Sequence, residues 1–209
     1  MSGTIKLENG LRRALFAPIQ ANGTWGEILD VAKLTQITAQ TAEGENQLAA
    51  GNMTIYSKKS KGKTTGTIGF YGITPEGQRK IFGTKLNSDG LELSGQKDEK
   101  PLGALILEFT AVNPDTNMEE DGFMIFPKTS LGELSDEVAS KDADGNETIN
   151  AKSLSYTALP LDNKNKTYKA KGFGETPTEI TAEMFNPAEE NTDSRAKVGF
   201  AKVGESTVA

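Results

Sequence analysis

The chain has 209 residues, a formal net charge of −6, and neither cysteine nor histidine. Its length suits one large domain, because all-β domains often reach this size as a single unit. Without cysteine and histidine it has no disulfides, no zinc site of the usual kind and no Ser-His-Asp catalysis. We therefore expect a protein that is not an enzyme, with no catalytic residues, no cofactor and no bound metal.

The first thirteen residues lack the apolar core of a signal peptide, and no run approaches the roughly 18 apolar residues of a membrane span. We expect a soluble protein, made in a cytoplasm and without membrane contact. Next along the chain, residues 11–19, 34–40, 52–59 and 63–73 have the composition of strands. Glycines recur in the last of these at Gly66, Gly69 and Gly72, which indicates bends or close backbone approach.

A short helix is predicted over residues 74–83. Thr74 suits the N-cap, Pro75 the first helical position and Gly83 the left-handed stop. Its apolar side chains are Ile81 and Phe82, so packing of these two residues against another element has to hold the helix in place.

Two strands follow at 104–112 and 123–129, joined by the turn-rich segment 113–122, and are predicted to form an antiparallel hairpin. Pro127 places the second strand near an edge or a bulge. A longer strand is predicted at 147–161, in which Ser153, Ser155 and Thr157 form a consistently polar face that could line water.

From about residue 175 the chain becomes polar and is predicted to be loosely ordered. The expected organisation is a β domain over residues 1–175 and a C-terminal extension over 176–209, loosely ordered or forming an interface. The expected fold is mainly β, an antiparallel β-sandwich or barrel with one flanking α-helix.

Charge is unevenly distributed along the chain. Residues 54–87 carry seven bases against one acid, whereas residues 88–147 carry fifteen acids and four lysines. These charges are either ordinary solvated faces or complementary surfaces through which one subunit meets the next. For the second alternative, the candidate contacts between successive subunits are Lys58, Lys59, Lys61, Lys63, Glu119, Glu120, Asp121, Asp142 and Asp144.

Two acidic clusters are weak candidates for chemistry. Asp142 and Asp144 have the alternate spacing of a calcium loop, but Glu147 and Ser153 stand where that loop needs its glycine and its last glutamate. The acids at 119–121 are interpreted as solvated charge at a loop tip rather than as paired catalytic carboxylates.

In order along the chain, residues 10–173 contain the segments GLRRALFAPI, GITPEGQRKIFG, NSDGLELSG, DEKPLGALILEF, the long run from GFMIFPKTS to SYTALPL, and KTYKAKGF. In this order they resemble the major tail tube proteins of long-tailed phages of Gram-positive hosts. Residues 41–62 depart from the family pattern.

The resemblance implies two packed antiparallel sheets flanked by one helix, assembled as stacked hexameric rings. The inner sheets would join around a lumen through which DNA passes without specific binding, past a net-negative wall. It also implies a place in the virion tail, assembly in the host cytoplasm, and tape measure, tail terminator and distal tail proteins as partners. A surface-exposed β-sandwich adhesin or binding module remains the alternative.

Overall fold

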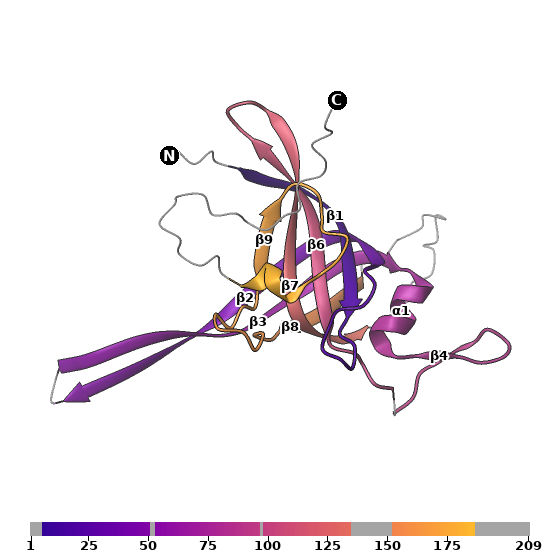
Figure 1. The fold of residues 1–209 in the computed structure, drawn as a ribbon, viewed down its shortest axis with the longest axis horizontal. Coiled ribbons are helices and arrows are strands. Elements are labelled where there is room, and N and C mark those ends of the chain that lie inside the picture. Colours follow the sequence, from indigo (N-terminus) through magenta and orange to yellow (C-terminus); the bar gives the residue numbers. More distant parts are fainter. Residues whose placement is uncertain (1–5, 51–52, 97, 135–151, 187–209) are drawn as a thin grey trace, which may run out of the picture.

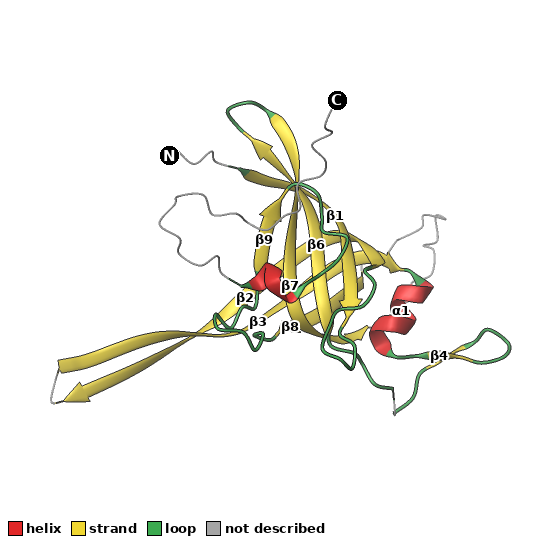
Figure 2. Ribbon diagram, viewed as in Figure 1, coloured by secondary structure: helices red, strands yellow, loops and turns green. Residues whose placement is uncertain are grey.

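The computed structural model describes residues 6–50, 53–96, 98–134 and 152–186 (Figure 1). Strands dominate, and one α-helix lies beside them (Figure 2). This confirms the expected mainly β fold with one flanking helix. The elements are β1 (Leu7–Pro18), β2 (Leu29–Ala50), β3 (Met53–Ile73), α1 (Pro75–Phe82), β4 (Lys85–Leu86), β5 (Glu92–Leu93), β6 (Gly103–Asn113), β7 (Met118–Leu134), β8 (Lys152–Ala158), β9 (Ala170–Phe173) and the 3-10 helix η1 (Ala182–Phe185).

The main sheet closes on itself as an antiparallel barrel. Its strand order is β6-β1-β2-β3-β8-β7-β9, and an additional pairing of β6 with β7 joins the two sides. β7 changes partner along its length, because Met118–Phe126 pairs with β6 and Thr129–Leu134 pairs with β8. The register with β6 shifts between Phe126 and Thr129, so Pro127 lies at a bulge, as expected.

The barrel interior is filled by alternate side chains from every strand of the ring. Along β8, Leu154, Tyr156 and Ala158 are buried, and they meet aromatic side chains such as Phe16 and Phe126 from other strands. The Phe126 and Tyr156 ring centroids are 5.1 Å apart. Burial of these rings is the main stabilising term for such a core.

The helix forms where its local signals place it. The Thr74 hydroxyl accepts a hydrogen bond from the Gly77 backbone N–H at 3.1 Å, and Gly83 ends the helix at φ 71°. Ile81 and Phe82 are 1 % and 7 % exposed and belong to the interior cluster, beside residues of β1 and β2. The helix therefore covers the end of the barrel where β1 stops and β2 begins.

A second apolar layer lies outside the barrel. Ile180 and Phe185, both buried, pack with side chains of β1, β6 and β7 such as Ile106 and Phe123. Trp25 joins this layer, with its ring centroid 5.5 Å from that of Phe185 and its indole N–H donating to the Pro127 carbonyl at 2.7 Å. Residues 176–186 thus do not form the loose extension that their polar composition suggested, because two apolar residues anchor them. Residues 187–209 lie outside the described part.

β3 is one continuous strand and not two. The predicted segments 52–59 and 63–73 join through the lysine-rich stretch between them, which pairs with the far half of β2. Gly66 shows the expected close approach, since a Cβ there would lie 2.0 Å from the Thr38 carbonyl oxygen and 2.7 Å from the Tyr156 ring. Gly72 shows no such close approach, because no heavy atom lies within 4 Å of a Cβ built at this residue.

Candidate assembly surfaces

An uncharged polar face covers β8 on the outside of the barrel. Ser153 and Ser155 are exposed and Thr157 is half-buried, while the alternate residues of the strand point into the core. The described strand is Lys152–Ala158; residues 159–161 of the predicted strand lie beyond its end, and residues 147–151 lie outside the described part. The predicted polar alternation therefore corresponds to an inside and an outside of the barrel.

The same kind of surface continues over two neighbouring strands. Thr157 and Ser155 of β8 lie opposite Thr65 and Thr67 of β3. These threonines in turn face β2, where the Thr38 and Thr67 hydroxyls are hydrogen-bonded at 2.8 Å. We define the hydroxyl face as Gln36, Thr38, Gln40, Thr65, Thr67, Ser153, Ser155 and Thr157. Sequence reasoning missed its β2 and β3 members, although the alternation of threonine and glutamine in residues 36–40 and 65–67 was a usable signal.

Strand edges border the hydroxyl face on both sides. In the described part of the chain, residues 36–50 of β2 pair only with β3, since the β1 pairing ends at Lys33. On the other side, residues 130–134 of β7 pair only with β8. Such edges present unpaired backbone N–H and C=O groups and readily accept another strand.

β2 and β3 continue beyond the barrel as a long two-stranded ribbon (Figure 1). The predicted basic residues Lys58, Lys59, Lys61 and Lys63 all lie on β3 in this ribbon, and Lys61 and Lys63 are exposed. By register, Lys61 is opposite Glu43 and Lys59 is opposite Glu45. The Lys61 and Glu43 side chains are both exposed, and opposite charges across two strands attract. The charge of Lys61 is therefore partly balanced within the same subunit.

The acids at 119–121 lie in a strand and not at a loop tip, which corrects the sequence interpretation. β7 begins at Met118, so Glu119, Glu120 and Asp121 pair with β6 through their backbones. Glu120 forms an ion pair with Lys6, and Asp121 forms one with Arg12 at 2.6 Å. Asp142 and Asp144, the other predicted acidic contacts, lie outside the described residues.

A buried carboxylate on β6 escaped the sequence analysis. The Glu108 side chain is 5 % exposed, and Arg13 of β1 donates to both of its oxygens, at 2.6 Å from Nε and 3.2 Å from Nη2. Burial by itself would raise the pKa of the Glu108 carboxyl, but hydrogen bonds from Arg13 and Thr176 outweigh it and hold the pKa below its usual value. Glu108 therefore links the barrel to the outer C-terminal layer.

Within the described ranges, no group of three or more acidic, histidine or cysteine side chains could hold a metal ion. No helix among these residues is long and apolar enough to cross a membrane.

The fold and its surfaces define a closed antiparallel barrel with a projecting ribbon and exposed strand edges. Neither a protein-family model nor a curated protein sequence matches the chain.

Proposed function

We propose that this protein is a structural subunit that assembles with its own copies into hexameric rings, which stack to form the tail tube of a phage and conduct DNA into the host. One observation carries the proposal: an uncharged polar face over β2, β3 and β8, bordered by the free edges of β2 and β7.

The strand directions make ring closure straightforward. Neighbours in the order β2-β3-β8-β7 are antiparallel, so β2 and β7 themselves run in opposite directions. Residues 130–134 of one copy can then join residues 36–43 of the next in an antiparallel pairing without turning either subunit over. Each hydroxyl face would point to the same side, and closure would pair the β2 and β7 edges that border it.

The chemistry of the hydroxyl face suits a conduit. Affinity for DNA comes mainly from Lys and Arg that neutralise phosphates, and the eight side chains of this face carry no charge. A wall built from this face would therefore neither bind nor repel the duplex strongly. This proposal replaces the net-negative wall that the resemblance implies. The same proposal includes assembly in the host cytoplasm and a place in the virion. It also includes contacts with tape measure, tail terminator and distal tail proteins.

The chain lacks cysteine, so single thiols can test the lumen directly. Ser155→Cys places a thiol on the hydroxyl face, and the control Asn165→Cys places one in the exposed loop before β9. Electron microscopy of the concentrated variants should show rings or tubes. In these assemblies a maleimide on a long polyethylene glycol should label residue 165 but not residue 155, whereas both should react in monomers.

Equal labelling of both sites in assembled particles would refute the lumen assignment. A monomer that stays inert at every concentration would refute the tube and favour a surface-binding β module.

A further inference from the structure

An apolar groove lies at the mouth of the barrel, the end opposite α1. One cavity of about 350 Å³ is lined by Leu11, Ile37 and Phe109 among others, and a second of about 430 Å³ by Leu7 and Val112. The two cavities share Glu8 and Asn9 of β1, so we treat them as one mouth groove.

The groove exists because β1 leaves β2 near the mouth. The two strands pair only over residues 13–16 of β1, and the β1 register with β6 shifts on both sides of Leu11. Gly10 adopts φ 65° in this irregular stretch, a backbone conformation that favours glycine. Towards the mouth, the inward side chains of β2 and β6 therefore remain open on one side.

A small leucine-bearing hairpin projects from the side of the molecule that carries α1 (Figure 1). β4 and β5 have two residues each, and their connection carries Leu91. Leu86, Leu91 and Leu93 are 49 %, 62 % and 53 % exposed. The Asn87 side chain fixes the turn by accepting hydrogen bonds from the Asp89 and Leu91 backbones at 2.9 and 2.8 Å. We call this element, residues 85–93, the leucine hairpin.

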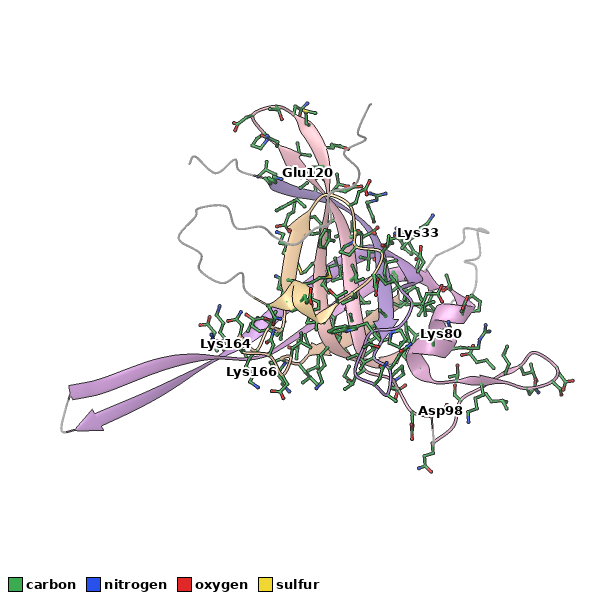
Figure 3. The ribbon with its side chains drawn as sticks, in the orientation of Figure 1. Lys33, Lys80, Asp98, Glu120, Lys164 and Lys166 are labelled. Carbon is green, nitrogen blue, oxygen red and sulfur yellow. The ribbon has the colours of Figure 1, made fainter. Side chains whose placement is uncertain are left out.

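Exposed apolar side chains gather at these two places. Of the large apolar residues that are exposed in the described part of the chain, Leu7, Leu11 and Met118 lie at the mouth, three lie in the leucine hairpin, and Tyr71 is the exception. Figure 3 shows the separation, with Glu120 near the mouth and Lys80 near the hairpin. Concentrated exposed apolar surface marks an interaction site.

We infer that the leucine hairpin of one copy docks into the mouth groove of the next. The apolar part of the groove, lined by Leu11, Ile37 and Phe109, can take the leucines, and the carboxylate of Glu119 at the groove rim complements Lys85 at the start of the hairpin. Because the two surfaces differ, the contact is head-to-tail and can continue from copy to copy. The inference rests on the proposed function for self-assembly and names the contact that joins successive subunits.

The test uses two single-cysteine variants, Leu91→Cys in the hairpin and Leu11→Cys in the groove. After mixing and mild oxidation, the pair should give a disulfide-linked dimer in much higher yield than either variant alone. Leu91→Cys mixed with Asn165→Cys is the matched control. A yield no higher than in this control would overturn the inference.

A second measurement addresses the energetics. Leu93→Ser in the Leu91→Cys variant, paired with Leu11→Cys, should lower the cross-linking yield by about tenfold, since one apolar contact is lost. Leu93 is exposed, so the subunit fold should persist. Electron microscopy of the same samples separates the two proposals: rings or tubes without the cross-link refute only the docking contact, and the absence of both refutes the tube as well.

Discussion

Gly66 lies where β2 and β8 approach the β3 backbone closely, and adding one methyl group there should be costly. The new Cβ would lie 2.0 Å from the Thr38 carbonyl oxygen and 2.7 Å from the Tyr156 ring. Overpacking of this kind costs about 1–3 kcal/mol. Tyr156 also donates its hydroxyl to the Thr38 carbonyl at 2.9 Å, and loss of that hydrogen bond adds about 1 kcal/mol. Gly66→Ala should therefore lower the free energy of unfolding by about 2–4 kcal/mol.

Gly72 provides the matched control in the same strand. Nothing lies within 4 Å of a Cβ at this position, so Gly72→Ala should be neutral or slightly stabilising. Urea unfolding of both variants, followed by the fluorescence of Trp25, measures the difference. Equal stability of Gly66→Ala and Gly72→Ala would show that Tyr156 does not press on β3 and that the packing argument is wrong.

Two further changes test the charged groups. Glu108→Gln should lower the free energy of unfolding by about 1.5–3 kcal/mol at pH 7, because it removes charge-assisted hydrogen bonds from Arg13. The folded-state pKa of Glu108 is lowered, so its contribution to stability exists above the ordinary pKa of 4.5 and is lost as the pH falls through the folded-state pKa. If urea unfolding shows that Glu108→Gln is destabilised by the same free energy at pH 3 as at pH 7, the assignment is contradicted. Lys61→Glu should destabilise the ribbon by about 0.2–1 kcal/mol, because it places two acids opposite each other. The double variant Glu43→Lys with Lys61→Glu exchanges the two charges and should restore the stability of the ribbon. Hydrogen exchange of the ribbon amides measures both variants, and a swap that restores nothing would count against the register.

Some of the structure could be predicted from the sequence because its cause is local. Thr74, Pro75 and Gly83 specify the start and stop of α1 within ten residues. The β6–β7 hairpin follows from two apolar runs around a turn-rich segment. The alternation at Ser153 and Ser155 already separates two faces of β8, whatever its neighbours are.

Tertiary structure decided what depends on partners distant in sequence. The hydroxyl face arises only when β8 pairs with β3, about ninety residues earlier in the chain, so three modest polar alternations become one surface. Residues 176–186 look loose by composition, yet Ile180 and Phe185 find the apolar outer side of β1, β6 and β7. Glu108 lies in an apolar run with no local basic partner, and Arg13 reaches it because β1 pairs with β6. Sequence periodicity gives the faces of each element, but burial and charge pairing depend on which faces the closed barrel brings together.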